Sequence, residues 1–266
     1  MSDTTPIPRT RPRRLAGVRT IPALILREMA TTYGRSPGGY LWAVLEPVAG
    51  IALLSLVFSV GFQAPALGIS FPMFYATGMI PFIFFTDVTG KLAQAINFSR
   101  ALLAYPCVTF LDAILARFLL NAATQVMVGY IVLAGLLFSF ETRAVLNPHA
   151  IMAAYAMLAV LSFGVGTINC FLMTRFPVWQ RVWSVAMRPM FIVSCIFFLF
   201  ETIPQPYRDY LWFNPLVHVT GIMRRGFYPS YDAAYASPAY VIGLGLGLGV
   251  AGLLFLRRYH RTLIDG

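Results

Sequence analysis

Residues 42–62 form an apolar run that constrains how the rest of the chain can fold. About 20 such residues, at a rise of about 1.5 Å each, match the roughly 30 Å hydrocarbon core of a bilayer. Tyr40 and Trp42 stand at its start, where amphipathic rings favour the headgroup level. Glu46 and Pro47 interrupt the run about one turn in. We interpret these residues as the first membrane crossing.

The whole chain has the composition of an integral membrane protein. Of its 266 residues, 58% are hydrophobic and 11% are charged, whereas soluble domains carry about 25% charged residues. The net charge of +10 comes largely from arginines that flank the apolar runs, as expected of topology signals and anionic-lipid contacts. We therefore expect membrane lipids as partners, no nucleic acid, and no separate soluble catalytic domain.

Five further apolar runs extend the pattern to six expected spans. These cover residues of about 42–62, 71–88, 112–138, 149–173, 182–200 and 238–257. Sixteen of the 20 Lys and Arg residues then fall on one side, and only Arg143, Arg208, Arg224 and Arg225 fall on the other. Such a bias places both termini in the cytoplasm and requires an even number of spans. The predicted fold is an all-α polytopic membrane protein with six transmembrane helices.

The segments at the two ends have their own character. Residues 1–14 are rich in Pro, Thr and Arg and are predicted to be a disordered cytoplasmic tail. Residues 15–36 carry apolar side chains at helical spacing among arginines, which favours an amphipathic helix in the membrane interface. A solvated basic linker is the alternative. Residues 37–257 form the predicted membrane domain, and 258–266 a cytoplasmic tail.

Two connecting segments are too polar to cross the membrane. Residues 96–105, between the second and third spans, predict a short cytoplasmic helix. Residues 201–232 are charged yet rich in aromatic side chains, so we expect short re-entrant or interfacial helices on the outer side, before the last span.

The sequence lacks the motifs of an enzyme. No phosphate-binding loop, zinc-protease motif or serine-hydrolase motif occurs, and the three cysteines are far apart. We expect no catalytic residue, metal or cofactor in this chain. The acidic residues are scattered, which disfavours a membrane-embedded lipid-modifying enzyme, and a proline-bent second span disfavours a purely structural scaffold.

A few polar residues admit two interpretations. Glu46 lies within a span, and such a group either faces a pathway or reaches the interface and pairs with an arginine. Arg224 and Arg225 stand near several aromatic residues and could hold an anionic or sugar-bearing ligand, or anchor a re-entrant element. Glycines spaced through 243–252 permit close helix packing.

Several blocks of sequence resemble a known family. They are GGYLWAVLEP and VFSVGF in the first span, ATGMIPFIFF in the second, AYPCVTFLDAILARF before the third, and FNPLVHVTGIMRRGFYPSYDAAYASPAY before the last. In this order they resemble the membrane subunit of ABC-2 type polysaccharide exporters, most closely the bacterial capsule-polysaccharide export permeases. The wider superfamily, with O-antigen, teichoic-acid and drug permeases, shares the plan and remains an alternative.

The resemblance implies a transport subunit of the bacterial inner membrane. It implies a homodimer, with a separate ATP-binding cassette subunit that holds ATP and Mg²⁺ for each chain. The substrate would be a lipid-linked polysaccharide, received by periplasmic and outer-membrane export proteins.

The resemblance also implies roles for individual residues. Contacts with the ATPase would come from Ile96, Asn97, Arg100, Leu103 and Tyr105. The substrate pathway would be lined by Tyr40, Trp42, Glu46, Phe58, Phe191, Phe198, Tyr207, Trp212, Arg224 and Arg225.

Overall fold

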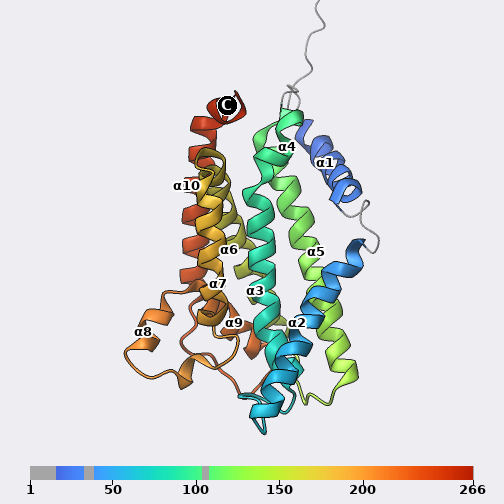
Figure 1. The fold of residues 1–266 in the computed structure, drawn as a ribbon, viewed down its shortest axis with the longest axis vertical. Coiled ribbons are helices and arrows are strands. Elements are labelled where there is room, and N and C mark those ends of the chain that lie inside the picture. The colour runs from blue at the N-terminus through green and yellow to red at the C-terminus, as the bar shows by residue number, and fades with distance from the viewer. Residues whose placement is uncertain (1–15, 33–38, 104–107, 266) are drawn as a thin grey trace, which may run out of the picture.

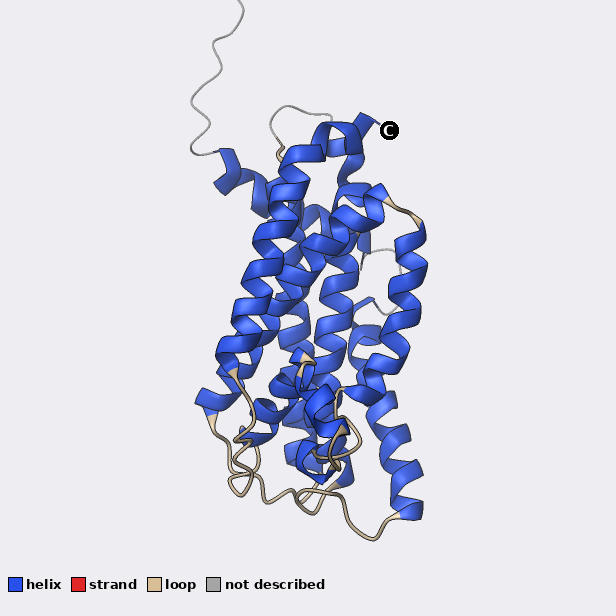
Figure 2. Ribbon diagram, turned by 90° about the vertical axis from the view of Figure 1, so that its left-hand side faces the viewer, coloured by secondary structure: helices blue, strands red, loops and turns tan. Residues whose placement is uncertain are grey.

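The computed structural model describes residues 16–32, 39–103 and 108–265, and the regular structure in these ranges is helical (Figure 2). The elements are α1 (Ala16–Thr32), α2 (Gly39–Gly61), α3 (Phe71–Ala93), α4 (Ala95–Leu103), α5 (Phe110–Ser139), α6 (Pro148–Arg175), α7 (Val178–Val193), η2 (Phe200–Thr202), α8 (Tyr207–Trp212), α9 (Pro215–Arg225) and α10 (Pro238–Asp265). The predicted tail at 1–14 lies outside the described residues. The predicted tail at 258–266 continues α10 as far as Asp265.

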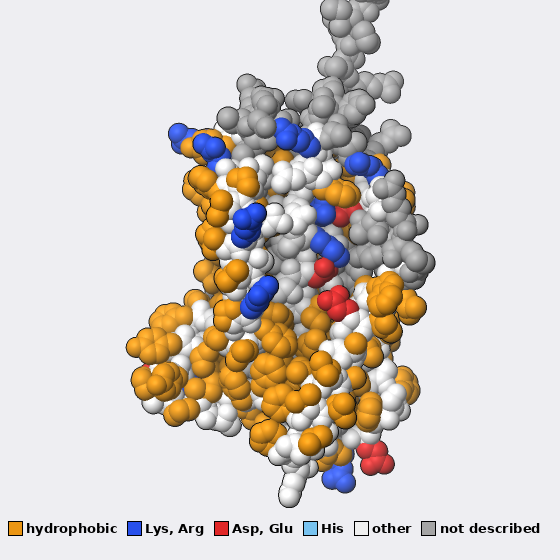
Figure 3. Space-filling model, in the orientation of Figure 1, with side chains coloured by type: hydrophobic (Ala, Val, Ile, Leu, Met, Phe, Trp, Pro, Cys, Tyr) orange, Lys and Arg blue, Asp and Glu red, His pale blue; other side chains and the backbone are white. Residues whose placement is uncertain are grey.

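Within the described residues, α2, α3, α5, α6 and α10 are long and apolar enough to cross a membrane. They form one bundle (Figure 1). The short helices α1 and α4 lie at one end of the bundle, together with the C-terminal end of α10 (Figure 1). The short helices α8 and α9 lie at the other end (Figure 1). Lys and Arg side chains gather over the half that carries α1 and α4, while hydrophobic side chains cover much of the other half (Figure 3).

The helix that corresponds to the expected fifth span is short. α7 has 16 residues, which at about 1.5 Å each gives about 24 Å, less than the hydrocarbon thickness. It ends where Cys195 adopts a left-handed φ of 57°, which a right-handed helix cannot include; the Ser194 Oγ just before it bonds to the Met190 carbonyl at 2.6 Å. Residues 194–199 are therefore not helical, although we expected the span to run to 200. The six-span count stays a prediction.

The spans are buried to very different degrees. In α3, 67% of the membrane-length window is buried, whereas in α2 the share is 17%. None of the residues of α7 is buried. The core therefore lies around α3, α5, α6 and α9, and α2 and α7 expose most of their surface.

Glycines bring α6 and α10 into backbone contact. A Cβ at Gly164 would meet the carbonyl of Gly245, and one at Gly252 would lie 2.7 Å from the backbone nitrogen of Ile168. Gly243 and Gly247, by contrast, face open space. The predicted small-residue packing is confirmed for one face of the repeat.

This contact generates a stability test. We expect Gly164→Val to force the two helices apart, with a cost of about 1–3 kcal/mol from overpacking. The thermal midpoint of the purified protein in detergent should fall by several degrees, whereas Gly243→Ala should leave it unchanged. Equal midpoints for the two variants would contradict the packing.

Candidate functional site

Arg224 is fully buried near the end of α9, a helix that lies with α8 at one end of the bundle (Figure 1). Its Nη1 donates to the Phe198 carbonyl and its Nη2 to the Ile196 carbonyl, each at 3.0 Å. The guanidinium also lies 4.4 Å from the centre of the Phe74 ring on α3, within the range of a cation–π contact. One side chain thus joins α9, α3 and the segment after α7.

Asn214 joins the same elements from the start of α9. Its Nδ2 donates to the Val193 carbonyl at 3.2 Å, while its Oδ1 accepts from the Leu216 amide at 3.0 Å. Asparagine is a good helix cap, and Pro215 follows it at the first helical position, where the missing amide hydrogen costs nothing. The Asn-Pro pair therefore begins α9, and Asn214 also donates a hydrogen bond to the carbonyl of the last residue of α7.

These bonds explain how the non-helical segment 194–199 is tolerated. Peptide groups without partners are costly in hydrocarbon, so irregular backbone survives there only inside protein. Ser194, Cys195 and Ile196 are buried, and three carbonyls of this region accept from Asn214 and Arg224. α9 thus supports the C-terminal end of α7.

His218 of α9 connects α8 and the residue before α10 by hydrogen bonds. The His218 Nε2 lies 2.7 Å from the Trp212 carbonyl, and the Ser237 amide donates to Nδ1 at 3.1 Å. A carbonyl only accepts, so the proton is on Nε2 and the ring is neutral. Burial lowers the pKa of His218, which agrees with a neutral ring. Burial likewise raises the pKa of Tyr228 to about 12.

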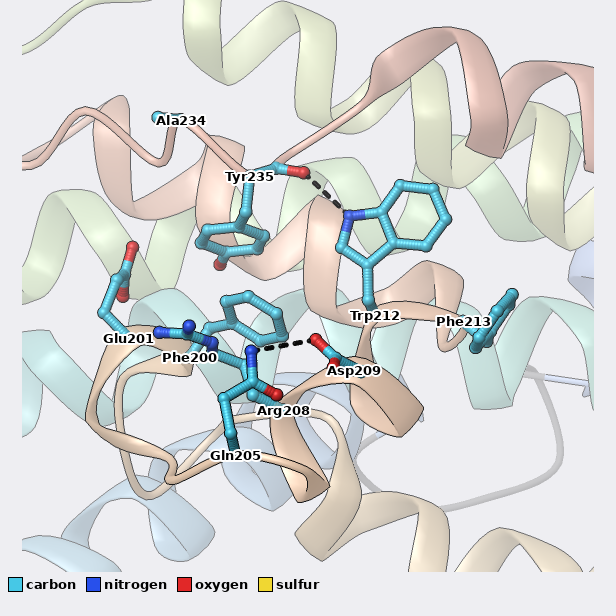
Figure 4. Close-up of a pocket in the computed structure, with 9 residues that line it drawn as sticks. All are labelled: Phe200, Glu201, Gln205, Arg208, Asp209, Trp212, Phe213, Ala234 and Tyr235. Carbon is cyan, nitrogen blue, oxygen red and sulfur yellow. Dashed lines mark hydrogen bonds between the residues drawn. The ribbon is translucent and has the colours of Figure 1, made fainter.

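A pocket of about 500 Å³ lies between α8 and the loop before α10 (Figure 4). It is lined by Phe200, Glu201, Gln205, Arg208, Asp209, Trp212, Phe213, Ala234 and Tyr235. The Phe200 and Tyr235 rings stack with centroids 4.1 Å apart, and the Trp212 indole N–H donates to the Tyr235 carbonyl at 3.2 Å. Rings beside charged and amide groups form a wall on which a sugar ring can stack and be hydrogen-bonded.

Aromatic rings connect α2 to α7. Phe58 lies 5.6 Å from Phe197 between centroids, and Phe197 lies 5.3 Å from Phe191. Phe191 also meets Phe82 of α3 edge-on at 5.1 Å. The predicted pathway residues Phe58 and Phe191 are therefore brought together, through a ring that the sequence did not single out.

The exposed face of α7 carries two arginines. Arg181, Val185, Arg188 and Ile192 recur at intervals of four and three residues and are all exposed, so they share one helix face. The opposite face packs on the core through Trp183, Met187, Met190 and Phe191. A charged side chain facing lipid is costly, and among the described residues neither guanidinium has a hydrogen bond or ion pair. This face therefore favours contact with water or an anion.

At the other end of the bundle, α4 docks through one side only. Ala95, Ile96 and Ser99 are buried, whereas Asn97 and Arg100 are exposed. Ile96 packs in a cluster with Leu92, Ile114, Cys170 and Leu256. Asn97 and Arg100 therefore lie on the side of α4 that faces away from this cluster.

The other predicted site residues are placed as follows. Trp42, Glu46 and Tyr207 are exposed, Phe198 is half-buried beside Arg224, and Arg225 is exposed with its Nε 4.0 Å from Asp232. The side chains of Tyr40, Leu103 and Tyr105 lie outside the described residues. The roles assigned to these residues stay predictions.

The two neighbouring arginines of α9 provide a matched test. We expect Arg224→Met to leave the buried Ile196 carbonyl and the half-buried Phe198 carbonyl without these donors, at a cost of about 2–5 kcal/mol. Arg225→Gln removes only an exposed pair, which is worth less than about 1 kcal/mol. The folded fraction that survives heating in detergent, followed by size-exclusion chromatography, should fall for Arg224→Met alone. Similar survival of both variants would show that the buried bonds do not hold the fold.

Comparison with known proteins places the chain among transporters. Residues 19–228 match the family of ABC-2 type transporters. The polysialic acid transport protein KpsM of Escherichia coli is 32% identical over 245 residues, which cover 92% of this chain and 95% of that protein. Two capsule polysaccharide export inner-membrane proteins, CtrC of Neisseria meningitidis and BexB of Haemophilus influenzae, are 26% and 25% identical, each over 91% of this chain and 92% of their own lengths. The chain therefore belongs to the ABC-2 type transporter family.

Proposed function

We propose that this chain is the membrane-spanning permease of an ATP-driven exporter that moves a lipid-linked capsular polysaccharide across the bacterial inner membrane. The similarity to three proteins named for polysialic acid transport or capsule export, along nearly the whole chain, carries this proposal. Both termini lie in the cytoplasm, and the chain works as a homodimer that passes its substrate to export proteins of the periplasm and outer membrane.

The exposed faces of the chain suit an acidic glycan. Arg181 and Arg188 lie seven residues apart on α7, about 10 Å along the helix axis. Acidic sugars or a phosphate-containing anchor would pair with both. At the outer end, the pocket beside Trp212 offers ring stacking to sugars as they leave. The glycan would thus meet cations first and aromatic rings later.

Energy has to come from a second subunit. The sequence contains no phosphate-binding loop, and the exposed side of α4 lies at the basic end of the bundle (Figures 1 and 3). An ATP-binding cassette subunit that holds ATP and Mg²⁺ would bind there and move α4. The permease itself would not be an enzyme.

Export in cells tests the proposal. We would express the chain with its candidate ATP-binding subunit in a bacterium that lacks its own capsule permease and measure capsule at the surface. We expect surface capsule to be restored. The double variant Arg181→Gln/Arg188→Gln should lower it by about tenfold or more, because each lost charge pair is worth on the order of 1 kcal/mol when partly desolvated.

The matched control is Arg143→Gln, an exposed arginine in the loop between α5 and α6 that lies outside the predicted substrate pathway, which should export normally. Co-purification of the ATP-binding subunit is measured in the same cells. No restored capsule despite a stable complex would assign the chain another ABC-2 substrate. No complex at all would contradict the proposal.

A further inference from the structure

Arg117 of α5 is a buried arginine that touches two short helices at once. Only 9% of its side chain is exposed. It lies in the first third of a span whose N-terminus is fixed by a capping box between Thr109 and Asp112. The start of α5 is therefore fixed, and Arg117 can hold the two short helices that it contacts, α1 and α4, against this fixed helix.

On one side, Arg117 holds α1. Its Nε lies 3.4 Å from Oε1 of Glu28, whose side chain is equally buried. Asn121, one turn further along α5, donates from Nδ2 to the Arg117 carbonyl at 2.7 Å and lies 3.5 Å from the same Glu28 oxygen. Glu28 is the buried acid of a helix that otherwise exposes most of its described residues. Its charge is compensated by Arg117 and Asn121.

On the other side, Arg117 holds α4. Its guanidinium carbon lies 4.2 Å from the centre of the Phe98 ring. A guanidinium stacked on a ring face is attracted by the negative charge of that face. Phe98 is 40% exposed, so the arginine covers one side of the ring and leaves the other open at the end of the bundle where α4 lies.

We propose that Arg117 is a positioning residue that couples α4 to α1, so that a displacement of α4 is passed to α1 and to the span α5. The proposal rests on the proposed function in one respect, namely that an ATP-binding subunit presses on α4. A buried arginine cannot release one neighbour without losing charge compensation or ring stacking. The three helices therefore move together or not at all.

Two single variants separate the two contacts. Glu28→Gln removes the charge that holds α1 and leaves Phe98 in place. Phe98→Leu removes the ring that holds α4 and leaves Glu28 in place. The control for the first is Arg27→Gln, because Arg27 is the exposed neighbour of Glu28 on the same helix.

The docking of α1 can be followed by cysteine labelling. Leu24 is half-buried one turn before Glu28, so Leu24→Cys, in a chain whose Cys107, Cys170 and Cys195 are replaced by alanine, reports on that face. The full-length chain is studied in membrane vesicles with its ATP-binding subunit, and the rate of maleimide labelling is measured without nucleotide and with a non-hydrolysable ATP analogue.

We expect Glu28→Gln to raise the labelling rate about fivefold or more without nucleotide, because a destabilisation of one or two kcal/mol changes the open fraction by that factor. Arg27→Gln should not change it. In the parent chain the ATP analogue should change the labelling rate. In Phe98→Leu the rate without nucleotide should match the parent, but the response to the analogue should be lost.

Exchanging the charges of Glu28 and Arg117 tests the contact with α1 and the contact with α4 in one variant. In Glu28→Arg/Arg117→Glu the pair to α1 is restored, but a carboxylate now faces the Phe98 ring, which repels it. Labelling without nucleotide should return to the parent rate while the nucleotide response stays lost.

Other outcomes overturn the proposal. Unchanged labelling in Glu28→Gln would show that the pair does not hold α1, and a full nucleotide response in Phe98→Leu would show that the ring does not transmit movement. If the ATP-binding subunit does not co-purify with the parent chain, the proposed function fails as well. If it co-purifies and only capsule is missing, the labelling results still decide the role of Arg117.

Discussion

The end of the bundle that carries α8 and α9 depends on two hydrogen bonds that Arg224 donates to carbonyls just beyond the end of α7. Without these donors, the buried segment 194–196 would contain peptide groups that lack partners, which is costly inside a protein. With them, α7 can stop short at Val193, and α9 can enter the bundle beneath it. The early end of α7 and the position of α9 therefore depend on each other, because side chains of α9 and its cap donate to the carbonyls at and beyond the end of α7.

A similar arrangement recurs at the opposite end of the bundle. There, too, a buried arginine, Arg117, lies between a ring and an oxygen-bearing partner and ties short helices to a span. The two sites differ in their partners, since Arg224 binds neutral carbonyls and Arg117 binds a carboxylate. A neutral partner fixes geometry alone, whereas an ion pair also responds to any loss of charge compensation. This contrast suits a fixed support at Arg224 and, at Arg117, a contact that passes a movement of α4 to α1 and α5, as proposed above.

Much of the fold could be predicted from apolar run length, because hydrocarbon leaves a chain few alternatives to helices. The apolar runs correspond to the long helices α2, α3, α5, α6 and α10, although α3 continues to Ala93 and α10 to Asp265, beyond the ends of their runs. The early end of α7 could not be predicted, since its apolar pattern continues through Phe200 and the interruption is satisfied by Asn214 and Arg224 from a later helix. For the same reason, the sequence suggested a ligand or an anchor for Arg224 but not which carbonyls it binds. Glu28 and Arg117 are 89 positions apart, so only the fold reveals their pairing.

The glycine contact between α6 and α10 has a mechanical consequence. Where backbones touch at Gly164 and Gly245, no side chain can change rotamer to absorb a shift of one helix along the other. The two helices therefore behave as a single rigid unit. α2 and α7, by contrast, expose most of their surface, so we expect any widening of the protein during transport to come from these two helices rather than from the α6–α10 pair.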